Sequence, residues 1–281
     1  MKTKIKIFLI SIIAAFLSSC SSPSFFQLYN VTPVEKMVSN SDYLIYEDEN
    51  CRVLYNLWGQ GGNIGFRLFN KTDKNIFLNL DKSFFVLNET AYNYYKNRVF
   101  TSSKSTGITS SKETTASKSE TGLNFLDLLQ TNKSQSTNSL NLSSASGFAI
   151  SYNEEKTVCI PSKTSKLILE YNVNETLFRD CDLYKFPSKK QIKPISFSKD
   201  NSPFVFSNII NYSVGQSITP ITLQNDFFVS EITNYPENSF IRYKNQEFCG
   251  QKSELKSSYF FETAPNKFYI QYSKGQDIWE H

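Results

Sequence analysis

The chain has 281 residues and a formal net charge of +4, with 40% hydrophobic and 15% aromatic side chains. This length suffices for one large or two small domains, and this composition supports a buried core and excludes a chain that is disordered throughout. The 24 Phe and 16 Tyr favour β-strands over helices. The weak charge lacks the basic excess with which proteins neutralise nucleic-acid phosphates, so we expect no nucleic-acid partner.

The first 20 residues carry the pattern of an exported chain. Lys2, Lys4 and Lys6 form a basic region, which the uncharged apolar run at 7–17 follows. This run is shorter than the ~20 residues that a membrane-spanning helix needs, and it is typical of a signal peptide. It ends in the sequence Leu-Ser-Ser-Cys at 17–20, where an aliphatic residue and two small residues precede a cysteine.

This ending resembles the lipobox of bacterial lipoproteins, and the chain resembles envelope lipoproteins of Bacteroidota. The resemblance implies cleavage before Cys20 and attachment of acyl chains to Cys20, which would anchor the chain in a membrane. An ordinary secretory signal is the alternative. Ser21 and Ser22 follow the cysteine without acidic neighbours, which for such lipoproteins implies the outer membrane and its periplasmic side. Cleavage removes three lysines and leaves a formal charge of +1.

Alternating apolar and polar residues dominate the chain from residue 43 onward. The period of two is clearest over 52–58, 64–70 and 76–80, and it is the period of half-buried strands. Turn-forming residues recur about every 8–12 residues, and no long helical period competes. These patterns predict an all-β, immunoglobulin-like antiparallel sandwich with additional C-terminal β structure.

Shifts in composition divide the chain into parts. The segment at about 101–146, rich in Ser, Thr, Lys and Asn, has little apolar area to bury and predicts a long, disordered and mobile insertion. Within it, 123–130 has the spacing of two helical turns, which are marginal unless they dock. The expected parts are the signal peptide at 1–19, an acylated tether and first strand at 20–42, the sandwich domain at 43–190, and a C-terminal β region at 191–281 that is either a second small domain or an extension of the first.

Four cysteines remain if Cys20 is acylated: Cys51, Cys159, Cys181 and Cys249. An even number in an oxidising compartment predicts two disulfides, for which three pairings exist. A Cys159–Cys181 bridge would join neighbouring segments, and a Cys51–Cys249 bridge would join the two ends of the fold. Free cysteines are the alternative, and the lack of a CxxC pair argues against zinc.

The sequence offers little for catalysis. His281 is the single histidine and the last residue, which argues against Ser-His-Asp and Cys-His catalysis and against histidine-based metal sites. Acidic residues crowd one turn, but this pattern is more typical of a solvated loop than of a glycosidase or calcium site. We expect no catalytic residue, no cofactor and no metal. The acidic residues in question are Glu47, Asp48 and Glu49, with Glu154, Glu155, Asp180 and Asp182 interpreted in the same way.

Four glycines crowd the stretch at 57–66 and suggest a phosphate-binding loop. The spacing departs from GxGxxG, because Ile64 occupies the last glycine position, and strand alternation follows where a helix would be needed. The glycines instead predict a hairpin connection, with positive φ angles in the Gly-Gly-Asn segment at 61–63. Gly65 then predicts a bulge or close packing beneath Trp58.

Trp58 is either a core residue or a flat platform for a sugar ring. Taken together, the patterns predict a non-catalytic envelope lipoprotein that is anchored to the membrane through Cys20 and binds or scaffolds another envelope protein or a glycan. A surface glycan-binding lipoprotein and a carboxylate-dependent hydrolase are the alternatives. Aromatic rings exposed together would favour the glycan, paired acids in a cleft would favour the hydrolase, and a broad apolar patch alone would favour the scaffold.

Overall fold

The structure, a computed structural model, describes residues 23–106, 146–217 and 219–275, with the backbone alone at 102–106 and 146–150. The predicted signal peptide, Cys20 and most of the predicted insertion lie outside the described residues. The chain divides into two units, which are described separately. One unit comprises Met1–Lys96 with Glu155–His281, and the other comprises Asn97–Glu154.

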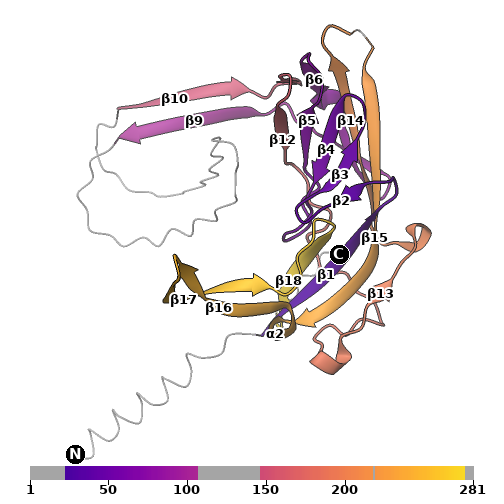
Figure 1. Ribbon diagram of the computed structural model, residues 1–281, viewed down its shortest axis with the longest axis vertical. Helices are drawn as coiled ribbons and strands as arrows, with labels where there is room; N and C mark the ends of the chain where they lie inside the picture. The colour runs from indigo at the N-terminus through magenta and orange to yellow at the C-terminus, as the bar shows by residue number, and fades with distance from the viewer. Residues whose placement is uncertain (1–22, 107–145, 218, 276–281) are drawn as a thin grey trace, which may run out of the picture. The chain divides into compact units, whose positions relative to one another are not determined.

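The larger unit is an all-β sandwich whose strands pair antiparallel in every described ladder (Figure 1). Its larger sheet has nine strands, of which six form the path β11-β6-β14-β15-β1-β18. β7 pairs with β14 and β8, and β13 pairs with β15. The bounds are β1 Ser24–Pro33, β6 Ile76–Asn79, β7 Phe84–Leu87, β8 Thr90–Asn93, β11 Thr157–Ile160, β13 Ile195–Ser196, β14 Val205–Val214, β15 Ile221–Pro236 and β18 Lys267–Ser273.

The second sheet has five strands in the order β12-β5-β4-β3-β2. Together the two sheets confirm the predicted all-β antiparallel sandwich. The strands β14, β15 and β18 from the C-terminal part pair within the nine-stranded sheet, next to β6 and β1. The bounds of the second sheet are β2 Val38–Ser39, β3 Leu44–Glu47, β4 Cys51–Tyr55, β5 Phe66–Asn70 and β12 Ser165–Ile168.

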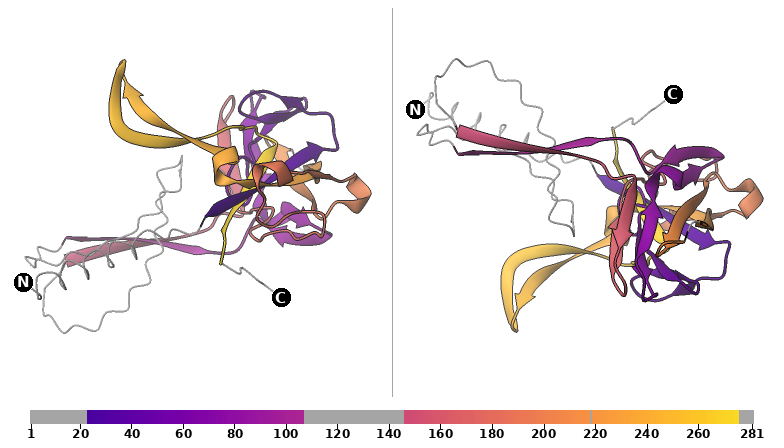
Figure 2. Two further views of the ribbon diagram at one scale, coloured as in Figure 1. Left: turned by 90° about the horizontal axis from the view of Figure 1, so that it is seen from below. Right: turned by 90° about the horizontal axis from the view of Figure 1, so that it is seen from above.

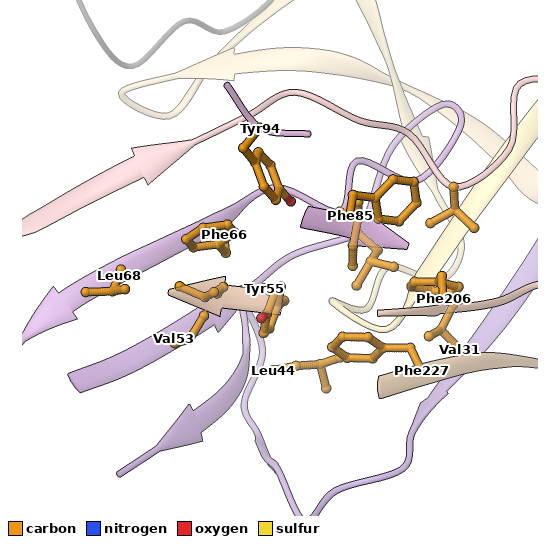
Figure 3. Packing of buried hydrophobic residues seen from close by; sticks show 14 of the residues in the cluster. Val31, Leu44, Val53, Tyr55, Phe66, Leu68, Phe85, Tyr94, Phe206 and Phe227 are labelled. Atoms are coloured by element: carbon orange, nitrogen blue, oxygen red, sulfur yellow. The ribbon is translucent and has the colours of Figure 1, made fainter. Parts of the chain in front are cut away.

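The core lies between the two sheets. Side chains alternate along β4 and β5, so that Val53, Tyr55 and Phe66 point inward and are fully buried. Figure 3 shows them facing Phe206 and Phe227 of the larger sheet, and the rings of Tyr55 and Phe227 lie 5.1 Å apart in an edge-to-face arrangement. Each buried aromatic side chain contributes about 1.5–3 kcal/mol to stability, so this layer holds the sheets together.

The helices that the structure describes are short. They are α2 at Glu237–Phe240 and three single turns, η1 at Leu80–Lys82, η2 at Lys189–Gln191 and η3 at Lys199–Asn201. None of these described helices has the length and apolar character to cross a membrane. The strands β16 (Ile241–Phe248) and β17 (Gln251–Phe260) follow α2 and form a two-stranded sheet of their own.

The smaller unit contains one ladder. β9 (Val99–Thr106) pairs with β10 (Ser146–Asn153), from Val99 opposite Asn153 to Thr106 opposite Ser146. The Glu154 N–H donates to the Arg98 carbonyl at 2.8 Å, which brings the two ends of the unit together. β9 extends to Thr106, whereas the composition predicts that the insertion begins at about residue 101.

The glycine-rich stretch connects two antiparallel neighbours, β4 and β5, which confirms the predicted hairpin connection. β4 ends at Tyr55 and β5 begins at Phe66, and these two residues pair across the ladder. Gly61 and Gly62 have φ angles of 80° and 70°, which confirms the predicted positive-φ positions. Gly65 lies outside the strand, and a Cβ there would meet Asn63, Ile168 and Leu169, so the predicted packing beneath Trp58 is wrong.

Candidate binding surfaces

Strands β16 and β17 form a hairpin at 241–260, which we call the arm. Its ladder runs from Ile241 opposite Phe260 to Phe248 opposite Gln251. Cys249 and Gly250 form the turn with φ angles of 50° and 80°, a combination typical of the two-residue type I′ turn. Between Arg242 and Tyr259 no residue is buried, and Figure 2 shows the arm extending away from the sandwich in both views.

A cluster of aromatic rings on the outer face of the larger sheet fixes the base of the arm. Phe240, at the end of α2, is buried, and its ring stacks on Phe26 of β1 at 4.7 Å. Because side chains alternate along β1, Phe26 faces this cluster whereas Tyr29 faces the main core. Phe260 and Tyr269 also pack there. The base is therefore anchored, while the rest of the arm is exposed.

Large apolar side chains lie exposed along the arm. Phe248, the last residue before the turn, is 84% exposed, which is the largest value among the apolar side chains of the described residues, and Leu255 is 67% exposed. Tyr243 and Tyr259 are exposed as well. A two-stranded hairpin is at best marginally stable alone in water, and this one exposes four large apolar side chains. The arm therefore has the character of a contact surface.

Basic side chains accompany these apolar groups. The register places Arg242 opposite Tyr259 and Lys244 opposite Ser257, so that Arg242, Lys244 and Tyr259 share one face, and it shifts between Asn245 and Glu247, where Leu255 lies in the irregular part of β17. The Lys244 ammonium lies 5.9 Å from the centre of the Tyr259 ring. The arm carries more basic than acidic residues, which gives it a net positive charge: Arg242, Lys244, Lys252 and Lys256 against Glu247 and Glu254.

A shallow pocket of about 440 Å³ lies where the larger sheet ends at β18. The glycine-rich connection covers part of this edge, because the Gly61 N–H donates to the Tyr269 carbonyl at 2.9 Å and Gln60 Oε1 accepts the Gln271 N–H at 2.9 Å. The lining offers amide, phenol and hydroxyl groups, which suit a neutral polar ligand. It consists of Gln60, Tyr269, Gln271, Tyr272 and Ser273.

Trp58 lies in the aromatic cluster at the base of the arm. Its ring is 5.0 Å from that of Phe260 and 5.4 Å from that of Tyr269, and the side chain is half-buried. These contacts make Trp58 a packing residue outside the main core, adjacent through Tyr269 to the pocket.

The four cysteines of the described residues are free thiols, so the two predicted disulfides do not form in this structure. Cys51 is buried on β4, whereas Cys159, Cys181 and Cys249 are exposed. Cys249 is in the turn of the arm, and Cys159 points outward on β11 between the buried Val158 and Ile160. Burial raises the pKa of the Cys51 thiol to about 12, and the neighbouring Asp48 carboxylate acts in the same direction.

The acidic residues considered for catalysis have structural partners. Glu47 pairs with Arg52 at 3.0 Å and with Lys71 at 2.8 Å, and hydrogen bonds from these two cations lower its pKa to about 2. Asp48 accepts the N–H groups of Asn50 and Cys51 and orders the turn. No group of three or more acidic, histidine or cysteine side chains with the geometry of a metal site occurs in the described parts of the chain.

Two further acids also have structural contacts. Glu154, expected in a solvated loop, is an ion-pair partner of Arg98 at 2.5 Å. Asp180 accepts the Asp182 N–H within a turn. These contacts account for both carboxylates without a catalytic role.

Sequence reasoning missed the arm as a surface. It lies within the C-terminal region at 191–281 that the sequence predicts to be β structure, but no pattern assigned it to a separate ladder. A usable signal existed: between Arg242 and Glu247 only Tyr243 is apolar, whereas β14 carries buried apolar residues along its length. Comparison of the chain with protein-family models, with curated proteins and with solved structures finds no match.

Proposed function

We propose that this chain is a membrane-anchored lipoprotein of the cell envelope with a non-catalytic binding or scaffolding role. The lipobox-like sequence at 17–20 supports the anchor, and it favours the outer membrane and its periplasmic side. The observation that carries the binding role is the arm, which exposes Phe248 and Leu255 on a two-stranded ladder of its own. Aromatic side chains and arginine are enriched at contact surfaces, and the arm carries Phe248, Tyr259 and Arg242.

The anchor is tested by changing Cys20 to Ala and labelling cells with a palmitate analogue. The original chain should incorporate the label, and Cys20→Ala should accumulate as an unlabelled precursor. Label in the variant at the level of the original chain would exclude Cys20 as the acylated residue. Cys159→Ala is the control, because it removes an exposed thiol outside the signal.

The binding role is tested by placing a photo-crosslinking amino acid at Phe248 in living cells. Adducts with a protein or a lipid should form from this position. Val38 is a matched control position, since it is 65% exposed on β2. Equal crosslinking from both positions, or none from Phe248, would count against the arm as a binding surface.

Glycan binding is a second candidate, favoured by the polar pocket beside an aromatic cluster. Gln60 and Gln271 present amides next to the Tyr269 ring, and Trp58 packs behind that ring. Titration calorimetry with envelope polysaccharide fragments should then show binding that Gln271→Ala weakens and Gln246→Ala, on the arm, leaves unchanged. Equal affinities of the Gln271→Ala and Gln246→Ala variants for these fragments would argue against glycan binding at the pocket. The lining of this pocket contains no carboxylate, so the pocket gives the hydrolase alternative no support.

A further inference from the structure

We infer that the arm binds the lipid surface to which the chain is anchored, with Phe248 and Leu255 entering the bilayer interface and the basic side chains contacting anionic headgroups. This inference rests on the proposed function and names the arm's partner: a phospholipid bilayer. Three observations carry it, namely where the arm starts, how long it is, and how apolar and basic groups are distributed along it.

The arm starts beside the first described strand. Phe240, which precedes β16, stacks on Phe26 near the start of β1, and Figure 1 shows the beginning of β1 next to α2 and the base of the arm. Cys20 is four residues before Ser24, so even a fully extended chain separates the two by at most about 14 Å. Acylation of Cys20 would therefore hold the base of the arm close to the membrane surface.

The arm is long enough to bridge that separation. β16 contains eight residues from Ile241 to Phe248, which at ~3.3 Å per residue span roughly 26 Å. This length exceeds the reach of the tether, so the turn can contact the bilayer while the sandwich remains in water. Because lipid-exposed turns do not occur in the hydrocarbon centre, the contact is at the boundary of headgroups and acyl chains, ~5–10 Å deep.

The chemistry of the arm matches a lipid surface. Phe248 is next to the turn and is the most exposed apolar side chain of the described residues. Lys252 is in the rung next to that of Phe248, and Lys256 and Lys244 lie further along the ladder. Phe248 is at the far end with Lys252 behind it, and Leu255 follows between Lys252 and Lys256. Apolar groups interleaved with cations in this way suit contact with an anionic lipid surface, where each basic residue strengthens binding about fivefold.

The test uses the chain from residue 20 with Cys20→Ser, so that acyl chains take no part. In one form Cys159→Ser and Cys181→Ser leave Cys249 as the exposed thiol, which is labelled with the polarity-sensitive dye NBD. In the matched control Cys181→Ser and Cys249→Ser leave Cys159 for the same dye. Cys51 is buried and stays unlabelled in the folded chain. Each form is mixed with vesicles of phosphatidylcholine, with or without phosphatidylglycerol.

The dye on Cys249 should shift to the blue and brighten with the anionic vesicles, and the dye on Cys159 should not. Phe248→Ser together with Leu255→Ser should weaken vesicle binding tenfold or more, from the loss of two apolar side chains. Lys252→Gln should weaken it about fivefold, and higher salt should weaken it further. Val38→Ser, which removes an exposed apolar group on β2, should leave binding unchanged.

The inference would be overturned if the emission of the dye on Cys249 did not change with anionic vesicles. It would also be overturned if the Phe248→Ser, Leu255→Ser variant bound these vesicles as tightly as the chain without these two substitutions. If in-cell crosslinking from position 248 then yields a protein adduct, the binding role is supported and the lipid is excluded as the partner of the arm. If the arm binds anionic vesicles but Cys20 is not acylated, the proposed acyl anchor is wrong, and the arm is still a membrane contact. Each failure is thus distinguishable.

Discussion

Gly62 is held against the ring of Phe268 in the main core. Its φ angle is 70°, and a Cβ at this position would lie 2.5 Å from the Phe268 ring. Substitution to Ala therefore meets two penalties, about 1–2 kcal/mol for the left-handed backbone and about 1–3 kcal/mol for overpacking. We expect Gly62→Ala to lower the free energy of unfolding by roughly 2–5 kcal/mol in urea denaturation.

Substitution of Gly275 by Ala measures the backbone penalty without the packing penalty. Its φ angle is 95° and a Cβ there would meet nothing within 4 Å. Gly275→Ala should therefore cost only about 1–2 kcal/mol or less, from the backbone alone. Equal losses for the two variants would show that contact with Phe268 contributes nothing.

Cys51 makes the stability of the sandwich sensitive to alkaline pH. Its pKa in the folded chain is raised to about 12 by burial and by Asp48, against about 8.5 for an unfolded chain. Between these values the folded state binds more protons than the unfolded state, so stability is full below about pH 8.5 and falls as the pH rises. Cys51→Ala should flatten this fall between about pH 8.5 and 10 by roughly 1.4 kcal/mol per pH unit.

Urea titrations at several pH values measure this slope. Cys159→Ala is the control, because its thiol is exposed, and its slope should match that of the original chain. A Cys51→Ala protein with the original slope would mean that the thiol ionises normally in the folded state.

At the residue scale the sequence was informative where backbone geometry decides. Gly61 and Gly62 were predictable, because few other residues adopt positive φ angles at low cost. The state of the cysteines was not predictable in this way, since an even count of cysteines says nothing about where their Cβ atoms point. Cys51 points into the core from β4, whereas Cys249 is in an exposed turn.

Phe240 is the central ring of the aromatic cluster at the base of the arm. Phe240 contacts Phe26, Phe260 and Tyr269, and deleting a buried Phe side chain costs about 3–5 kcal/mol. Because the arm itself has no buried residue, this loss of stability weakens the attachment of the arm to the sandwich. We expect Phe240→Ala to speed tryptic cleavage at Arg242 and Lys256 at least tenfold by local opening.

Limited proteolysis read by mass spectrometry measures this effect. Phe261→Ala is the matched control, because Phe261 is exposed and adjacent to the arm. Its cleavage rate should remain near that of the original chain. Equal rates for the Phe240→Ala protein and the original chain would mean that the aromatic cluster does not hold the arm.

At the element scale the sequence predicted strands but not their partners. The period of two over 52–58 and 64–70 revealed the strands that became β4 and β5, and their closeness in sequence gave the pairing. β1 pairs instead with β15 and β18, about 200 residues away, and alternation carries no information about such distant pairings. The pocket at the edge of β18 depends on those pairings and was therefore not predictable.

The smaller unit is predicted to be dispensable for folding of the larger one. Among the strands that the structure describes, β9 and β10 pair only with each other, and the contact between Glu154 and Arg98 closes the unit at its base. Replacing Asn97–Glu154 by a short Gly-Ser linker should leave a cooperative unfolding transition. The free energy of unfolding should stay level or rise by up to roughly 2 kcal/mol, because a shorter connection lowers the entropic cost of closing the loop.

Urea denaturation of the shortened chain, followed by aromatic fluorescence, measures this outcome, since the core rings of Tyr55, Phe66 and Phe227 all belong to the larger unit. The sandwich class was predictable at this scale because alternation extends over most of the chain. Composition predicted an insertion at about 101–146, but it did not predict the β9-β10 ladder, because strand patterns alone do not separate a ladder that joins a sheet from one that pairs with itself. A stability loss of more than about 2 kcal/mol on deletion would mean that the larger unit needs the smaller one to fold.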